Sequence, residues 1–278
     1  MGRKVAGMIG GVLAMRRGAF VLRRWWRETR LARRAVVHES PHFILGMQKS
    51  GTSAIAGLLA LRTGVPTTVD LEREWRASTI DRAASGPVAF RRFVRRNAAD
   101  FSRPVVKEPS LTFVTDRLRE YWPGMRPVLV VRDPVTTIRS ILDRLDVRGD
   151  LPTLGPSERR RVPDGWRTVL DNGWLGIDAP HYVDQLAERW NLAAGLAVDP
   201  GPDWLVIRYE DFVADKLAAI DRVVEHFDLP VVAEIDAFLD RPFQPRGRRR
   251  PPEDVFGANL QRILDRTSPL ARRLGYHP

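Results

Sequence analysis

Short apolar runs alternate along this chain with longer segments in which apolar residues recur at helical spacing. A short apolar run closed by polar residues is typical of a buried strand. Four such runs are found, at 43–47, 104–107, 127–131 and 204–209. Each is followed by a stretch with helical periodicity; after the first run, for example, Ala54, Ile55, Leu58 and Leu59 fall on one helical face.

The remaining elements follow the same logic. We expect further helices at 90–101, 111–122 with Ser110 as N-cap, 135–145, 180–198, 211–227, 231–240 and 254–273. The segment 146–178, rich in Pro and Gly, is expected to be irregular. Alternating strands and helices predict an α/β fold, a P-loop-like three-layer architecture with a central parallel sheet flanked by helices.

Polar residues follow every predicted strand. Lys49 comes after the first strand, Lys107 ends the second, Arg132 follows the third and Tyr209 ends the fourth. Since the carboxyl ends of parallel strands meet at one sheet edge, where ligands of open α/β sheets bind, these side chains should lie together.

Composition divides the chain into two parts. Residues 1–34 hold ten Lys or Arg and one Glu, so they carry +9 of the net +11 and leave +2 for the rest. We therefore expect a basic helical extension at 1–40 and one catalytic domain at 41–278, and no nucleic-acid-binding role for that domain. With no Cys and five scattered His, the sequence offers neither a disulfide framework nor a metal-ligand pattern.

The extension has its own candidate partner. Phe20, Leu22, Trp25 and Trp26 stand among arginines, a composition that suits an anionic membrane surface; a solvated or partner-packed helix is the alternative. The apolar run 5–15 is too short to span a bilayer, and no signal peptide is recognisable. We expect a cytoplasmic protein that is either soluble or peripheral on the inner face of the membrane.

The segment between the first strand and helix is a candidate phosphate cradle. Gly46 and Gly51 are spaced as in a nucleotide-triphosphate loop, but Lys49 precedes Gly51 instead of following it. Backbone N–H groups of the helix start, a glycine, a lysine and hydroxyl groups together suit a phosphate. The order G-x-x-K-S-G-T-S resembles the 5′-phosphosulfate loop of sulfotransferases that use 3′-phosphoadenosine-5′-phosphosulfate (PAPS). This resemblance implies that Lys49, Ser50, Gly51, Thr52 and Ser53 bind the donor.

Two later segments extend the resemblance over about 43–228. Arg132-Asp133-Pro134 with Ser140 eight residues on is similar to the sulfotransferase 3′-phosphate motif. By the same resemblance Tyr209 would lie near adenine. An arginine of the basic segment 246–250 would reach the 3′-phosphate, and Arg248 is taken as the representative of that segment.

The catalytic groups also come from the resemblance. Val106-Lys107-Glu108-Pro109 looks like the Lys-Asp-Pro corner of tyrosylprotein and several bacterial sulfotransferases, whose lysine contacts the transferring sulfonate. Asp70, Glu72 and Glu108 are candidates for the general base that takes the acceptor's proton. Asp70, 21 residues after Lys49, is preferred. Pro109 stands where the cytosolic enzymes have a catalytic histidine, so a histidine mechanism is not indicated.

The implied activity is in-line transfer of a sulfonate from PAPS to a hydroxyl of a carbohydrate, lipid or small molecule, releasing 3′-phosphoadenosine-5′-phosphate (PAP), with no metal required. Trp166 and Trp174 are expected to shape the acceptor site. Two alternatives stay open: a small-molecule kinase or other phosphate-transfer enzyme on the same fold, and a non-catalytic basic membrane-surface protein.

Overall fold

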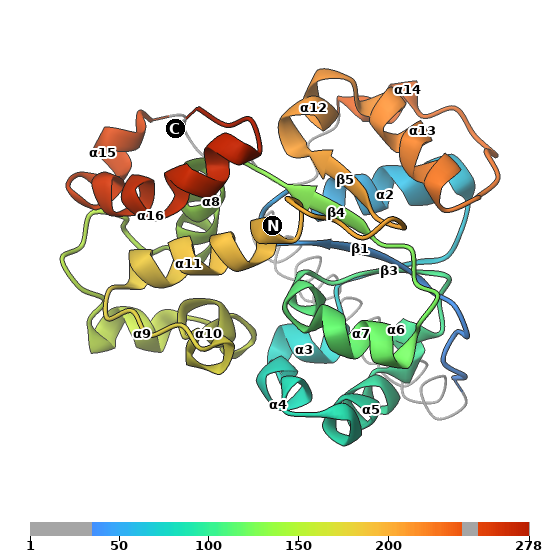
Figure 1. Ribbon diagram of the computed structural model, residues 1–278, viewed down its shortest axis with the longest axis horizontal. Coiled ribbons are helices and arrows are strands. Elements are labelled where there is room, and N and C mark those ends of the chain that lie inside the picture. The colour runs from blue at the N-terminus through green and yellow to red at the C-terminus, as the bar shows by residue number, and fades with distance from the viewer. Residues whose placement is uncertain (1–34, 241–249, 278) are drawn as a thin grey trace, which may run out of the picture.

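Figure 1 shows the computed structural model, in which residues 35–240 and 250–277 are described. Its centre is a parallel sheet in the strand order β2-β3-β1-β4-β5. The strands are β1 (His42–Gly46), β2 (Thr67–Val69), β3 (Val105–Lys107), β4 (Val128–Val131) and β5 (Leu205–Arg208). Ile44 in the central strand is in register with Lys107 on one side and Val128 on the other. The predicted α/β fold and its four strands are confirmed.

The sequence prediction lacked β2. This strand is three residues long, lies at the edge of the sheet and has a single apolar residue, Val69. Such a segment produces no run of apolar residues, and its position is set by its pairing with β3.

Two hydrophobic cores cover the two faces of the sheet, because successive strand residues point in opposite directions. Ile44 packs with α2 (Thr52–Thr63), α12 (Tyr209–Ala214), α13 (Lys216–His226) and α14 (Asp236–Leu239). Phe43 and Leu45 belong to the other core, to which the remaining helices apart from α3 and α9 contribute side chains. The remaining helices are α3 (Glu72–Arg76), α4 (Ile80–Ala84), α5 (Pro87–Arg96), α6 (Ala98–Phe101), η1 (Pro109–Val114), α7 (Thr115–Tyr121), α8 (Pro134–Leu145), α9 (Pro156–Arg161), α10 (Asp164–Leu170), η2 (Gly173–Leu175), α11 (Tyr182–Gly195), α15 (Pro252–Phe256) and α16 (Asn259–Arg273).

Several helix ends differ from the prediction for local reasons. The expected helix 111–122 divides into η1 and α7, and Ser110 is not its cap; the Ser110 N–H donates to the Glu108 carboxylate (2.9 Å). The helix expected from 180 begins at Tyr182, because the His181 side chain accepts the N–H of Val183 (3.3 Å). The segment 231–240 is helical only over its last residues, in α14. The irregular segment 146–178 contains α9, α10 and η2.

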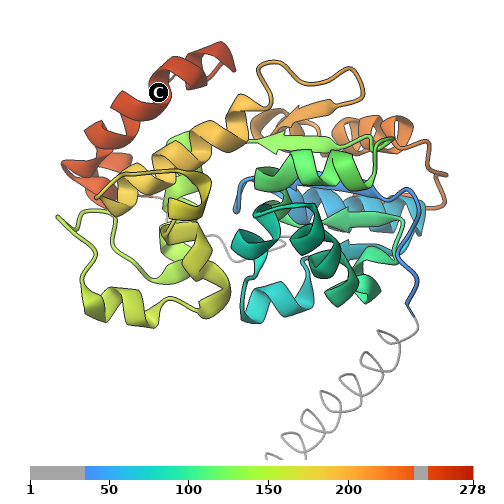
Figure 2. The same ribbon diagram turned by 60° about the horizontal axis from the view of Figure 1, so that its bottom comes forward.

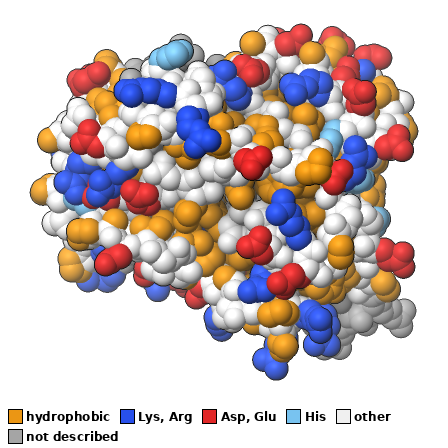
Figure 3. Space-filling model, in the orientation of Figure 1, with side chains coloured by type: hydrophobic (Ala, Val, Ile, Leu, Met, Phe, Trp, Pro, Cys, Tyr) orange, Lys and Arg blue, Asp and Glu red, His pale blue; other side chains and the backbone are white. Residues whose placement is uncertain are grey.

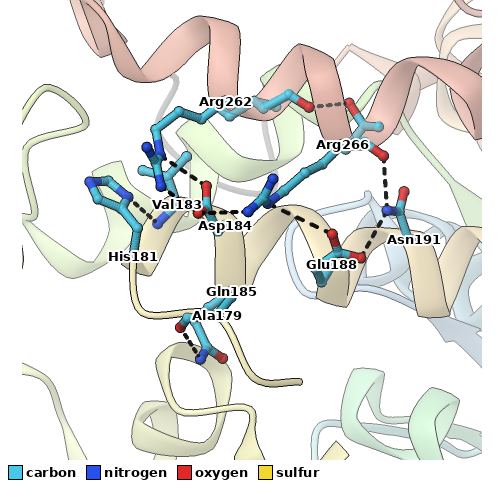
Figure 4. Close-up of polar contacts among 11 residues, drawn as sticks. Ala179, His181, Val183, Asp184, Gln185, Glu188, Asn191, Arg262 and Arg266 are labelled. Carbon is cyan, nitrogen blue, oxygen red and sulfur yellow. Dashed lines mark hydrogen bonds and ion pairs between the residues drawn. The ribbon is translucent and has the colours of Figure 1, made fainter. Parts of the chain in front are cut away.

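The last helix is fastened to α11, along which it packs (Figures 1 and 2). Asp184 of α11 is buried and accepts hydrogen bonds from Arg262 Nε (3.0 Å), Arg262 Nη2 (2.6 Å) and Arg266 Nη2 (2.9 Å). Asn191 donates to the Arg266 carbonyl (3.0 Å). Figure 4 shows these groups converging between the two helices. The C-terminal helix thus fixes α11, which carries residues of the site on another side.

The chain enters the sheet along α6 and the end of α7. The His38 N–H donates to the Phe101 carbonyl (2.8 Å), and Trp122 Nε1 donates to the His38 carbonyl (3.1 Å). The predicted boundary at 40/41 and the basic extension before it stay predictions, since 1–34 lie outside the described residues. Within 35–240 and 250–277, no helix combines the length and apolar character that crossing a membrane demands. Basic and acidic side chains intermingle over the face seen in Figure 3.

Candidate active site

The carboxyl edge of the sheet gathers the residues that the sequence places after the strands. Arg132 Nη1 donates to the Lys49 carbonyl (2.9 Å), and the Arg132 guanidinium lies 4.4 Å from the centre of the Tyr209 ring. Residues that follow β1, β4 and β5 therefore touch one another. Lys107, at the end of β3, lies close enough to depress the pKa of Lys49.

The loop between β1 and α2 has a conformation that its glycines permit. Gly46 has a φ of 143°, and a Cβ there would lie 2.5 Å from the Val130 carbonyl oxygen. Gly51 has a φ of 104°, and a Cβ there would lie 2.2 Å from Cδ2 of Tyr209. Lys49 itself is left-handed, with a φ of 71°, which costs a non-glycine residue about 1 kcal/mol. Strain of this kind persists where the surroundings over-determine the backbone, as at ligand-binding loops.

The hydroxyl residues of the loop differ in exposure. Thr52 is buried and Ser53 is partly exposed at the start of α2, where backbone N–H groups have no acceptor within the helix. Ser50 is buried and lines a cavity of about 10 Å³ together with Thr137 of α8. Within the described residues neither hydroxyl has a hydrogen-bond partner. The Ser50 hydroxyl is not exposed in this conformation, so the structure does not support its predicted contact with the phosphate of the donor. That role stays a prediction.

Positive charge accumulates around Lys49. Burial lowers the pKa of Lys49, and the nearby cations Arg144, Arg132 and Lys107 lower it further, while Asp143 opposes them. Burial also lowers the pKa of Arg132, whose buried Nε has no hydrogen-bond partner among the described residues. A bound polyanion would relieve the repulsion among these cations, so this edge is a candidate site for one.

Lys107 and Asp70 form an ion pair at the ends of β3 and β2. The distance from Nζ to Oδ1 is 2.5 Å, and the two side chains are 3% and 33% exposed. The Asp70 N–H donates to the Lys107 carbonyl (2.9 Å), which continues the strand pairing. The carboxylate that spacing favoured as base is thus held directly beside the predicted catalytic lysine.

The other two base candidates are engaged differently. Glu108 is buried and accepts the N–H groups of Leu71 (3.1 Å) and Ser110 (2.9 Å) through its two oxygens. Burial, followed by the negative charge of Asp70, raises its pKa. Glu72 pairs with Arg76 one turn along α3 (2.9 Å). Glu108 therefore shapes the turn that carries Asp70, and Asp70 is the candidate paired with Lys107.

The residues predicted to bind the 3′-phosphate lie partly within the described part of the chain. Ser140 lies on α8, partly exposed, two turns beyond the Asp133 that caps this helix. The neighbouring Arg139 donates to the Arg250 carbonyl (2.8 Å), so the last residue of the basic segment lies beside α8. Arg248 lies outside the described residues, and its role stays a prediction.

Several contacts of the site were not predicted from the sequence. Glu210 accepts the Asp133 N–H (3.1 Å) and the Tyr276 hydroxyl (3.0 Å), and so supports the turn after β4. Its position directly after Tyr209, at the end of the fourth predicted strand, was the available signal. The Arg144 guanidinium lies 5.8 Å from the ring centres of both Trp75 and Trp166, on three different elements. No local spacing reveals that contact.

A protein-family model described as "Sulfotransferase family" matches residues 67–234, which is more than half of the chain. The chain belongs to the sulfotransferase family. The match includes Lys107, Arg132, Ser140 and Tyr209 but not the loop around Lys49. The enzyme is therefore a sulfotransferase, and the phosphate-transfer alternative is not favoured.

The sulfotransferase also resembles solved structures, while no curated protein matches it. Sulfotransferase STF9 from Mycobacterium avium is 13% identical, with a TM-score of 0.51, covering 90% of this chain and 80% of its own, which supports the fold. The sulfotransferase domain from the curacin biosynthetic pathway is 15% identical (TM-score 0.48), with 86% and 98% covered. Mouse sulfotransferase SULT7A1, solved with PAP, is 14% identical (TM-score 0.42), with 76% and 67% covered.

Proposed function

We propose that this sulfotransferase moves a sulfonate from PAPS to an acceptor hydroxyl by in-line displacement. The observation that carries the proposal is the convergence of Lys49, Lys107 and Arg132 from three strand ends at the start of α2. A helix start and fixed cations are what a donor with a phosphosulfate and a second phosphate needs. The lowered pKa of Lys49 supports an anionic ligand at this edge.

The donor would be held at both of its phosphate groups. Lys49 and the N–H groups and hydroxyls of the loop would bind the 5′-phosphosulfate, with Ser50, Gly51, Thr52 and Ser53 as the loop residues. Arg132, Ser140 and an arginine of 246–250 such as Arg248 would bind the 3′-phosphate. The Arg132 guanidinium supports this role, because its hydrogen bond to the Lys49 carbonyl (2.9 Å) and its contact with the Tyr209 ring hold it in place, and a fixed guanidinium pairs well with a phosphate. Tyr209, stacked on Arg132, offers a ring face for adenine.

Transfer would use the Lys107–Asp70 pair. The acceptor oxygen attacks sulfur, its proton passes to Asp70, and the bond between sulfur and the bridging phosphate oxygen breaks to release PAP. Lys107 and Lys49 would stabilise the negative charge on the sulfonate and on the leaving phosphate. In this scheme the charge is met by side chains and a helix start, so no metal is required.

The acceptor would enter beside Trp75, Trp166 and Arg144. The Arg144 guanidinium lies 5.8 Å from the centres of both rings, which belong to α3 and α10, and its charge lowers the pKa of Lys49. Two indole rings at a site opening suit a sugar, a phenol or a lipid headgroup. If the acceptor is membrane-bound, the basic residues 1–34 would bind the anionic membrane surface. The enzyme would then be peripheral on the inner face of the membrane.

The test is transfer of ³⁵S from labelled PAPS to a panel of sugars, phenols and lipids. Lys107→Met should lower kcat about 100-fold or more, as loss of one charge-stabilising group does. Asp70→Asn should lower it about 100-fold or more. Glu72→Gln, on the neighbouring α3, is the matched control and should stay within about threefold. A wild-type enzyme that ignores PAPS but transfers the γ-phosphate of ATP would overturn the proposal.

A further inference from the structure

Arg189 is a completely buried cation beneath the site. It belongs to α11, its relative exposure is 0%, and burial lowers its pKa to about 9. Among the described residues no carboxylate lies within ion-pair distance of it; Glu108 acts on it only from farther away. Burying a charge without an ion-pair partner is unfavourable. An apolar residue in the same place would avoid that cost, so stability alone does not explain this arginine.

One arm of its guanidinium holds the donor loop. Nε and Nη2 both donate to Oε1 of Gln48, at 3.4 and 3.3 Å, although the two residues are 141 positions apart in the chain. Gln48 Nε2 in turn donates to the Ser110 hydroxyl (3.2 Å). Gln48 directly precedes the left-handed Lys49. Its fixed side chain therefore limits the conformations open to the strained part of the loop.

The other arm holds the segment between α10 and η2. Nη1 donates to Oδ1 of Asn172 (2.5 Å) and to the Thr168 carbonyl (3.0 Å). The flat face of the guanidinium lies 3.9 Å from the ring centre of Phe113 and 5.8 Å from that of Trp174. A planar fork with donors on both sides can join two segments in this way, and a lysine cannot.

The neighbouring residue strengthens the connection to the site. Trp190 Nε1 donates to the Arg132 carbonyl (2.8 Å) at the end of β4. On another side of the same helix, Asp184 and Asn191 bind α16, which fixes α11 in place (Figure 4). Helix α11 is thus a rigid support, and Arg189 is its contact to the donor loop.

We propose that Arg189 is a positioning residue for the donor: through Gln48 it holds the loop 47–51 in its anion-binding conformation, in register with the segment 168–174. The inference rests on the proposed function, because the loop is taken to bind PAPS. It adds to that function a buried arginine that never touches the donor. Its effect should appear in donor affinity and not only in stability.

The test is calorimetric titration with PAP of the wild type, Arg189→Met, Arg189→Lys, Gln48→Ala and the double variant Arg189→Met/Gln48→Ala. Arg189→Met and Gln48→Ala should each weaken PAP binding about tenfold or more. The Kd of the double variant should lie within about threefold of the Kd of the single variant that binds PAP more weakly, because both substitutions remove the same contact. Arg189→Lys, which keeps the charge but loses the fork, should fall between wild type and Arg189→Met.

Arg62 supplies a matched control. It is also a buried arginine, but it lies at the far end of α2 and pairs with Asp221 (3.0 Å) and Glu234 (2.8 Å). Arg62→Met should lower Tm and leave the Kd for PAP within about twofold.

The outcomes separate this inference from the proposed function. If Arg189 serves only stability, its variants will have a lower Tm and a lower bound stoichiometry, but their folded fraction will bind PAP with the wild-type Kd. That result would overturn the inference. Independent, multiplying effects in the double variant would also overturn it. If Arg189→Met does not fold, Gln48→Ala and Arg189→Lys decide the question by the same criteria. Failure of the wild type to bind PAP would instead overturn the proposed function, and this inference with it.

Discussion

At the scale of single residues, the pairing of Gly51 with Tyr209 shows why the loop tolerates no side chain there. The Tyr209 ring occupies the place of a Cβ at Gly51, and the φ of Gly51 is left-handed. Both effects act on the turn that presents Lys49. The same ring contacts Arg132, so a change at Gly51 would also disturb the residue proposed to bind the 3′-phosphate.

Gly51→Ala should therefore destabilise the protein by about 2 kcal/mol or more and weaken PAP binding at least about tenfold. Thermal unfolding and calorimetry measure the two effects. Gly124→Ala is the control, since a Cβ at Gly124 meets nothing within 4 Å. Wild-type affinity in Gly51→Ala would show that the loop does not hold the donor.

The lowered pKa of Lys49 predicts a pH dependence of donor binding. The ammonium must be charged to bind a phosphate, so affinity is complete below the lowered pKa and falls as pH rises through it, towards the ordinary value of 10.5. We expect the Kd for PAP to rise measurably as pH increases from neutral towards 10.5, before an ordinary lysine would be half deprotonated. Lys49→Arg, which stays charged, should change no more than about threefold over the same range. The same dependence of the Kd for PAP on pH in the wild type and in Lys49→Arg would contradict this role of Lys49.

At the scale of elements, α11 connects the C-terminal helix to the site. Asp184 faces two arginines of α16, while Arg189 and Trp190 reach the donor loop and the end of β4. A buried carboxylate with two partners is worth more than an exposed ion pair, because its loss removes the acceptor that Arg262 and Arg266 share and leaves Arg266 only its longer contact with Glu188 (3.7 Å).

Asp184→Asn should lower the free energy of unfolding by about 2–3 kcal/mol. Denaturant unfolding measures this loss. Glu188→Gln, one turn along α11 with a longer contact to Arg266 (3.7 Å), should cost less than about 0.5 kcal/mol. PAP binding of folded Asp184→Asn should stay within about threefold of wild type if α11 keeps its position. Equal destabilisation by both substitutions would contradict the special place of Asp184.

The sequence predicts elements well where the pattern is local and long. β1, β3, β4 and β5 are apolar runs with polar ends, and a parallel sheet follows from the helices between them. β2 was not predicted because two of its three residues are Thr and the strand is stabilised by pairing with β3, which no local pattern shows. Helix ends such as His181 depend on a side-chain cap that composition alone does not reveal.

At the scale of the whole molecule, the fold brings together what the sequence separates. Spacing and resemblance pointed to Lys49, Lys107 and Arg132, since each follows a strand. The ion pair of Lys107 with Asp70 needs the unpredicted β2 beside β3. The contact of Arg189 with Gln48 spans 141 residues, and a lone arginine in an amphipathic helix gives no sign of being buried.

The most direct test of the account is calorimetric titration with PAP and, separately, with ATP and Mg²⁺, of the wild type and Arg132→Ala. Arg222→Ala, an exposed arginine of α13, serves as control. The account predicts metal-independent PAP binding in the micromolar range, weakened by at least about 1.5 kcal/mol in Arg132→Ala and unchanged in the control. Tight binding of ATP with Mg²⁺ and indifference to PAP would contradict it.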